Sequence, residues 1–274
     1  MTRTRLVATD LDGTLLRSDR TISPRTARAM EEARRAGVEI VWATARARHS
    51  VHELAQSCGF RGKAICANGA VILDLTDGSP KITATTTIAM ESAAAAMNRV
   101  RAVMPGVAFA NVGPTGFVAE PAYAALCEFT DHQRHPHEMA LSELLPLPDE
   151  PMVKIVARHP DVSGAELYRT TVAAGVEGME LTHSGAPYVE MSASGVSKAS
   201  ALAELCAAEG ISSSEVAVVG DATNDVQMLK WAGTALCPSN AIDDILALAD
   251  RVLPSNDEDG VASFLESLIL QRAV

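Results

Sequence analysis

Apolar runs and helix-period segments alternate along the first and last thirds of the chain. A short apolar run at 6–9 predicts a buried strand, and a helix is predicted to begin at Ser23-Pro24 and to end at Gly37. Serine is a favoured helix cap, proline fits the first turn, and glycine is common at the end. The same alternation predicts strands at 38–43, 64–67, 216–219 and 234–237, and helices at 47–58, 197–208, 224–232 and 260–271. Such a pattern predicts an α/β fold, a doubly wound, Rossmann-like parallel sheet covered on both faces.

The middle third follows another pattern, which predicts an inserted domain. It combines a helical segment at 90–103 with strand-like runs at 107–111, 152–157 and 178–182. The stretch 131–151 is rich in histidine, proline and acidic residues and is typical of a surface loop. We therefore expect residues 1–83 and 188–274 to form the core, and residues 84–187 to form an inserted α+β domain.

Composition and charge restrict the classes of partner. The 274 residues are 47% apolar and 21% charged, as in an ordinary globular protein, and the formal net charge is −11. Nucleic acid and anionic membranes need a basic face, so neither is expected as a partner. Five cysteines without a CxxC pair, no signal peptide and no run of about 20 apolar residues predict a reduced, cytoplasmic protein without a membrane span.

Two acidic residues follow the predicted first strand. Asp10 and Asp12 are two positions apart, and side chains with that spacing point the same way in an extended chain. Like charges held close together are costly unless a positive group lies between them. The sequence therefore predicts a cation at Asp10 and Asp12.

Other polar motifs also lie at predicted strand ends or helix starts. They are Thr44-Ala45-Arg46, Ser197-Lys198 and Gly220-Asp221-Ala222-Thr223-Asn224-Asp225. Open parallel sheets bind ligands beyond the carboxyl ends of their strands, so we expect these segments to converge on one site. Four carboxylates without histidine or cysteine favour Mg²⁺.

These residue types suit phosphoryl transfer. An aspartate beside Mg²⁺ can attack phosphorus and form an aspartyl-phosphate, and a second acid can protonate the leaving oxygen and later activate water. Lys198 would neutralise negative charge on the transferring phosphoryl group, and the Thr44 hydroxyl would hold phosphate oxygens. A lysine in the first turn opposes the helix dipole, which favours a functional role for Lys198.

Several motifs also have a purely structural interpretation. A calcium loop that began at Asp10 would need glycine at its sixth position and glutamate at its twelfth, where Leu15 and Thr21 stand, so we exclude it. Acids such as Asp221 and Asp225 are common at helix starts, and Arg46 could be a solvated surface charge. Three histidines in 131–151 lack the spacing of a zinc site.

In their order along the chain, the motifs resemble those of phosphatases of the haloacid dehalogenase superfamily. Asn68-Gly69-Ala70, Ala232-Gly233 and Asn240-Ala241 are similar to the Cof-type branch, which has a large α/β cap between its second and third motifs. The resemblance implies a Mg²⁺-dependent phosphatase of small phosphorylated metabolites, such as sugar phosphates. We expect a monomer or a homodimer.

The resemblance also implies a role for each motif residue. Asp10 would be the nucleophile and Asp12 the general acid and base. Mg²⁺ would be bound by the Asp10 carboxylate, the Asp12 carbonyl and Asp221. The supporting and phosphate- or substrate-binding residues would be Thr44, Ala45, Arg46, Asn68, Lys198, Asn224 and Asp225.

The chain departs from the family pattern at Ala45 and Ala199, where glycine is usual. If position 45 needs a positive φ, alanine costs about 1 kcal/mol there, and its methyl group could crowd the substrate. We therefore expect an effect on substrate preference rather than on the chemistry. Substrate choice itself should depend on the insert, at about 83–187.

Two alternatives to a phosphatase stay open. A phosphomutase could use the same scaffold, although nothing in the sequence clearly excludes water from an aspartyl-phosphate, so hydrolysis is preferred. A regulatory phospho-acceptor domain also uses acids, a lysine and Mg²⁺. Its phosphorylated aspartate should follow a later strand than the acidic pair, and no long insert is expected there.

Overall fold

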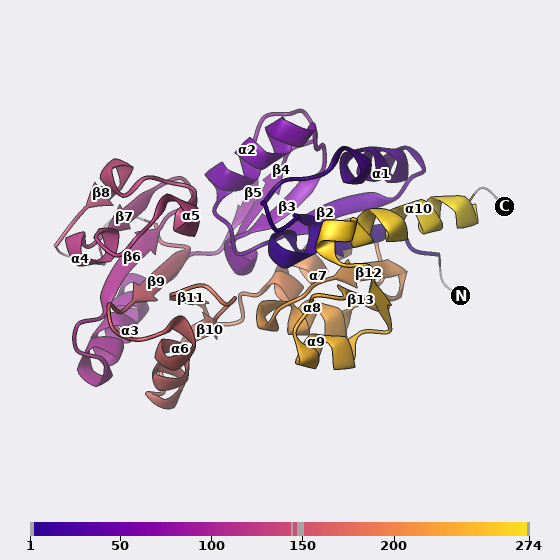
Figure 1. Cartoon of the computed structure of the whole chain (residues 1–274). Coiled ribbons are helices and arrows are strands. Elements are labelled where there is room, and N and C mark those ends of the chain that lie inside the picture. Colours follow the sequence, from indigo (N-terminus) through magenta and orange to yellow (C-terminus); the bar gives the residue numbers. More distant parts are fainter. Residues whose placement is uncertain (1–2, 144, 147–150, 273–274) are drawn as a thin grey trace.

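The computed structural model describes residues 3–143, 145–146 and 151–272, which form two sheets (Figure 1). The larger sheet has eight strands in the order β14-β13-β12-β1-β2-β3-β4-β5. Their bounds are β1 Leu6–Thr9, β2 Glu39–Ala43, β3 Lys63–Cys66, β4 Val71–Asp74, β5 Lys81–Thr85, β12 Val216–Val219, β13 Thr234–Pro238 and β14 Arg251–Leu253. Neighbouring strands from β14 to β3 are parallel, whereas β4 and β5 pair antiparallel at one edge.

Helices cover both faces of the larger sheet. We call this sheet and its helices the core. One face carries α1 (Pro24–Arg35), α2 (Arg48–Cys58) and α10 (Gly260–Arg272), and the other carries α7 (Lys198–Ala208), α8 (Val226–Trp231) and α9 (Asp243–Leu248) (Figure 1). In β1, Val7 packs toward the first group, whereas Leu6 and Ala8 pack toward the second. Both faces of this strand are therefore buried, which explains its uninterrupted apolar sequence.

The predicted helix starts are present in the structure. The hydroxyl of Ser23 accepts a hydrogen bond from the N–H of Thr26 at the start of α1, at 3.0 Å. Ser197 caps α7 in the same way and accepts from the N–H of Ser200 at 3.1 Å. The second cap places Lys198 at the first position of α7, beside the strand ends.

The smaller sheet and its helices form a second unit, which we call the cap. Its six strands have the order β10-β11-β9-β6-β7-β8. Their bounds are β6 Ala108–Val112, β7 Phe117–Ala119, β8 Ala140–Leu141, β9 Lys154–Arg158, β10 Met179–Thr182 and β11 Val189–Ala193. The cap helices are α3 (Met90–Val103), α4 (Pro121–Ala124), α5 (Phe129–His132) and α6 (Gly164–Ala173). In Figure 1 the cap lies to one side of the core, and the chain enters it after β5 and leaves it after β11.

Three details differ from the sequence predictions. The larger sheet is not wholly parallel, because the short β4 and β5 return as hairpins. The division into domains stays a prediction, but β11 pairs with the smaller sheet, so residues beyond the expected limit at 187 belong to the cap. The stretch 131–151 is not all surface loop. In its described part, His132 ends α5 and packs among the rings of Phe117, Tyr123 and Tyr188.

The helices in the described ranges are all too short or too polar to span a membrane. The expected cytoplasmic location stays a prediction.

Candidate active site

Loops that follow neighbouring strands of the larger sheet line a pocket of about 410 Å³. Asp10 directly follows β1, Thr44 follows β2, and Asp221 comes two residues after β12. Strand β1 lies between β12 and β2, where the order of the sheet reverses, and open α/β sheets bind ligands at that point. The cap lines the other side of the pocket with Phe117, His132, Lys154 and Tyr188.

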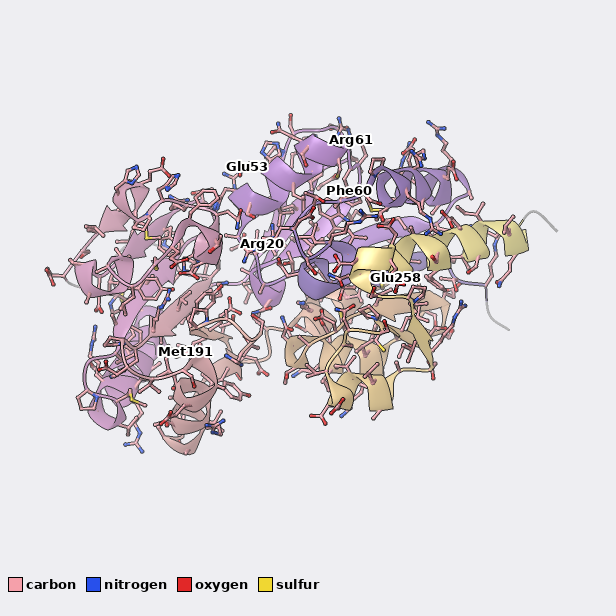
Figure 2. The ribbon with its side chains drawn as sticks, viewed as in Figure 1. Arg20, Glu53, Phe60, Arg61, Met191 and Glu258 are labelled. Atoms are coloured by element: carbon pink, nitrogen blue, oxygen red, sulfur yellow. The ribbon has the colours of Figure 1, made fainter. Side chains whose placement is uncertain are left out.

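Hydrogen bonds between the core and the cap close one side of the pocket. Arg20, which precedes α1, lies at the boundary between the two units (Figure 2), and its Nη1 donates to the carbonyl of Thr130 at 2.6 Å. Nε2 of His49 lies 3.1 Å from the carbonyl oxygen of His132. The pocket is therefore enclosed by both units in this structure.

Lys198 is the positive partner of two buried carboxylates. Its ammonium donates to Oδ1 of Asp10 at 2.6 Å and to Oδ1 of Asp225 at 2.7 Å, and its side chain is only 1% exposed. Burial raises the pKa of Asp10 well above its ordinary value, although the charge of Lys198 opposes the shift. These two acids explain how a lysine can occupy the first turn of α7 against the helix dipole.

Asp10, Asp221 and Asp225 form an acidic cluster, with one oxygen of each within 4.8 Å of the others. Thr14 donates its hydroxyl to Oδ1 of Asp221 at 2.7 Å. Gly13 has a φ of +81°, and a Cβ there would overlap the Asp221 carboxylate, so only glycine lets the chain approach so closely. Three carboxylates exceed the charge of one lysine, and oxygen donors suit a hard divalent cation.

Asp225 also holds the loop that carries Asp221. Its Oδ2 accepts from the N–H groups of Asp221 at 3.0 Å and Ala222 at 3.1 Å. Asp225 ends a single 3₁₀ turn, Thr223–Asp225, and is completely buried. One carboxylate therefore fixes both Lys198 and the Asp221 loop.

The carboxylate of Asp12 is not part of the acidic cluster, which corrects the expectation that the side chains of Asp10 and Asp12 lie together around one cation. Its side chain is 51% exposed, and its two oxygens accept from Arg46 at 2.6 and 2.7 Å. A turn at Leu11–Leu15 follows Asp10 at once and takes Asp12 to the pocket surface. Arg46 is therefore no solvated surface charge, because it is largely buried against Asp12.

The Thr44 loop is held by both units, since Lys154 of the cap donates to the carbonyl oxygen of Ala45 at 2.9 Å. Thr44 is buried, and its Oγ1 accepts from the N–H of Arg46 at 3.1 Å. Ala45 is not among the residues with a positive φ, so the backbone strain considered for this position does not arise. Ala199 lies within α7, where alanine is the most favourable residue. An effect of the two alanines on substrate preference stays a prediction.

Asn68 joins the core to two strands of the cap. Its Nδ2 donates to Glu190 at 2.8 Å and to Thr182 at 3.0 Å, and its Oδ1 accepts from Asn224 at 3.3 Å. Asn68 and Ala67 have φ values of +55° and +50°. This left-handed conformation costs an alanine roughly 1–2 kcal/mol, whereas asparagine tolerates it better. The hydrogen bonds from Asn68 to the cap offset this strain. The sequence did not reveal the left-handed conformation.

Sequence reasoning missed two buried charged residues of the cap. Lys154 on β9 donates to Glu190 on β11 and, at 2.9 Å, to the carbonyl oxygen of Ala45. Both side chains are buried, and Lys154 lines the pocket. The signal was a single lysine within an apolar run at 153–157, since a charge inside a buried strand requires a partner.

We expect Asp221→Asn to stabilise the metal-free protein above about pH 5. Burial, with the nearby Asp225, raises the pKa of Asp221 from 3.8 to about 6. A raised carboxyl pKa stabilises the folded state below the unfolded pKa, and this contribution is lost as the pH rises through the folded pKa. The amide has the same shape without the charge. Thermal unfolding in EDTA from pH 4 to 8 should show a variant Tm a few degrees higher near pH 8.

If Asp221 is a Mg²⁺ ligand, as we expect, the ion should reverse this order, because it would bind the wild type more tightly than the variant and so stabilise the wild type more. Equal pH profiles and equal Mg²⁺ responses of the two proteins would show that Asp221 is neither repelled in the cluster nor a ligand.

An open α/β core with an acidic cluster at its strand ends and an inserted cap is the arrangement of a haloacid dehalogenase-type hydrolase. The sequence model of the haloacid dehalogenase-like hydrolases matches residues 7–265, so the chain belongs to this family.

Named relatives are phosphatases that match over almost the full length. The pyridoxal phosphate phosphatase YbhA of Escherichia coli is 28% identical, with 97% of this chain and 99% of that protein covered. The 5-amino-6-(5-phospho-D-ribitylamino)uracil phosphatase YcsE of Bacillus subtilis is 29% identical, with 97% and 96% covered. The structure of SMU.1108c from Streptococcus mutans has the same fold, with a TM-score of 0.84, 22% identity, and 97% and 99% covered. The predicted Cof type and enzyme class, a phosphoric monoester hydrolase, are confirmed.

Proposed function

We propose that this protein is a Mg²⁺-dependent phosphatase of small phosphorylated metabolites, sugar phosphates among them, that acts through an aspartyl-phosphate on Asp10. The observation that carries the proposal is the buried carboxylate of Asp10, bonded to Lys198 at 2.6 Å, in a pocket shared with Asp12 and Asp221. The named relatives differ in their substrates, so they support the reaction rather than one metabolite.

The residues present fit a bound Mg²⁺. Carboxylates of Asp10 and Asp221 and the main-chain carbonyl of Asp12 would hold it, and Asp225 would support them. When bound, the ion neutralises charge on the phosphate and on the clustered acids. It would also favour the ionised form of Asp10, which burial alone disfavours.

The protein residues divide the reaction into two displacements. A carboxylate oxygen of Asp10 attacks phosphorus, the phosphorus–oxygen bond of the ester breaks, and protonated Asp12 gives its proton to the leaving oxygen. Water then attacks the aspartyl-phosphate and loses a proton to Asp12, which frees Asp10 and phosphate. Lys198 and the hydroxyl of Thr44 hold the phosphoryl oxygens, and Arg46 fixes the Asp12 carboxylate at the pocket surface.

The test is to trap the intermediate with Asp12→Asn. Acetyl phosphate has a good leaving group that needs no acid, so the first step should survive and the water step should slow. The variant should then accumulate a hydroxylamine-labile phosphoryl group in Mg²⁺, whereas the wild type should turn over and both should be inactive in EDTA. Introducing Asp10→Asn as well should abolish the labelling.

The fate of the phosphoryl group separates the three candidate functions. Release to water supports the phosphatase, and transfer to a second metabolite would indicate a phosphomutase. A wild-type protein that stays phosphorylated without turnover would indicate a phospho-acceptor domain.

A further inference from the structure

Aromatic rings of the cap form one wall of the pocket. Phe117, His132 and Tyr188, which we call the ring wall, all line it. The ring centroid of His132 lies 5.0 Å from that of Phe117 and 5.0 Å from that of Tyr188. Tyr123 supports the wall from behind, with its hydroxyl oxygen 2.7 Å from Nε2 of His132. Two of the chain's three tyrosines are thus gathered here, although aromatic residues make up only 4% of the sequence.

The ring wall is uncharged at physiological pH. Burial lowers the pKa of His132 to about 3, and the charge of Lys154 contributes to this shift. Burial also raises the pKa of Tyr188, so its phenol stays protonated. Neutral ring faces attract other planar rings, whereas they offer no hydrogen bonds to the hydroxyl groups of a polyol.

Tyr188 has a fixed position between the cap and the reacting groups. Its hydroxyl donates to the carbonyl oxygen of Asp131 at 3.1 Å, and Glu190 follows two residues later in β11. Asp10 and Asp12 lie on the core side of the same pocket. A volume of about 410 Å³ leaves room beside a phosphate for a leaving group of metabolite size.

Lys154 provides a polar contact beside the ring wall. An ammonium has three N–H donors. Within the described residues, the Lys154 ammonium donates to the carboxylate of Glu190 and to the carbonyl oxygen of Ala45. A third donor can therefore bond to an oxygen of a bound molecule. Glu190 keeps the charge of Lys154 paired, so the lysine can stay buried without a ligand.

We propose that the pocket selects phosphate monoesters whose alcohol carries a planar unsaturated ring with an acceptor oxygen. The ring lies against the ring wall, and the oxygen accepts a hydrogen bond from Lys154. This proposal rests on the proposed phosphatase function and narrows its substrates from sugar phosphates in general to ring-bearing esters.

The first experiment measures kcat/KM of the full-length, Mg²⁺-loaded protein for three esters of primary alcohols. Pyridoxine 5′-phosphate carries a ring with a phenolic oxygen, benzyl phosphate carries a ring alone, and glucose 6-phosphate carries no planar ring. We expect kcat/KM for pyridoxine 5′-phosphate to exceed kcat/KM for glucose 6-phosphate by at least about tenfold, because one ring contact is worth roughly that factor. The value for benzyl phosphate should lie between the two. Acetyl phosphate reports phosphatase activity without any ring contact.

Variants then test the two contacts separately. Tyr188→Leu should reduce the ratio of kcat/KM for pyridoxine 5′-phosphate to kcat/KM for glucose 6-phosphate by about tenfold. Tyr168→Leu is the matched control, since Tyr168 stacks on His183 in the cap and does not line the pocket, so the ratio should not change. The double variant Lys154→Met/Glu190→Gln removes both buried charges together and should abolish the advantage of pyridoxine 5′-phosphate over benzyl phosphate.

The wild-type ratios decide the proposal even if a variant fails to fold. A protein that hydrolyses acetyl phosphate, but ranks glucose 6-phosphate level with or above pyridoxine 5′-phosphate, would overturn the ring preference and leave the phosphatase function intact. If the protein hydrolysed neither acetyl phosphate nor any of the three esters, the phosphatase function would be overturned, and the ring preference with it.

Discussion

Asp10→Asn should lower kcat/KM for an aryl phosphate by at least about 10⁴-fold and leave the protein folded. The amide has the size of the carboxylate but cannot act as the nucleophile. Lys198 keeps Asp225 as a partner in the variant, at 2.7 Å. Loss of a buried carboxylate with a raised pKa should therefore cost little stability.

The control for this variant is Asp244→Asn, which removes an exposed carboxylate on α9 without contact to the pocket. Its rate should equal that of the wild type, and its unfolding temperature should fall by no more than a few degrees, since Asp244 lies in the first turn of α9. A folded Asp10→Asn protein that keeps a tenth of the wild-type rate would remove Asp10 from the nucleophilic role.

The parts of the fold that follow from the sequence depend on local signals. The apolar run of β1 and the serine caps at Ser23 and Ser197 determine where elements begin, because capping and periodicity act over a few residues. The loops with Asp10, Thr44 and Asp221 converge for a general reason, since the carboxyl ends of parallel strands meet at one edge of a sheet.

Residues whose role depends on distant partners were not predictable in this way. His132 lies in a polar, proline-containing stretch, and its burial depends on Phe117 and Tyr188, which are far away in the sequence. The ion pair between Asp12 and Arg46 was not predictable either, because no local rule pairs these two residues. A lone Lys154 in an apolar run did carry a signal, but the position of Glu190 as its partner required the cap sheet.

Lys198→Met should destabilise the metal-free protein strongly. The variant leaves Asp10 and Asp225 buried, close to Asp221, without their cation. Breaking a buried ion pair from one side costs about 3–5 kcal/mol, which corresponds to a fall in Tm of roughly 10 °C. Mg²⁺ should restore more stability to this variant than to the wild type, because the ion supplies charge that the lysine no longer provides.

Two further variants identify the cause of this loss. Lys230→Met, which replaces an exposed lysine on α8, should unfold like the wild type. Lys198→Met/Asp225→Asn removes one of the unpaired charges and should recover part of the lost Tm in EDTA, since the remaining repulsion is smaller. The recovery of Tm should be incomplete, because Asp225 also accepts hydrogen bonds from the N–H groups of Asp221 and Ala222. The oxygen of an amide accepts such bonds less strongly than a carboxylate does. If Lys198→Met unfolded at the wild-type temperature in EDTA, the acids would not depend on this lysine, and its place at the start of α7 would need another explanation.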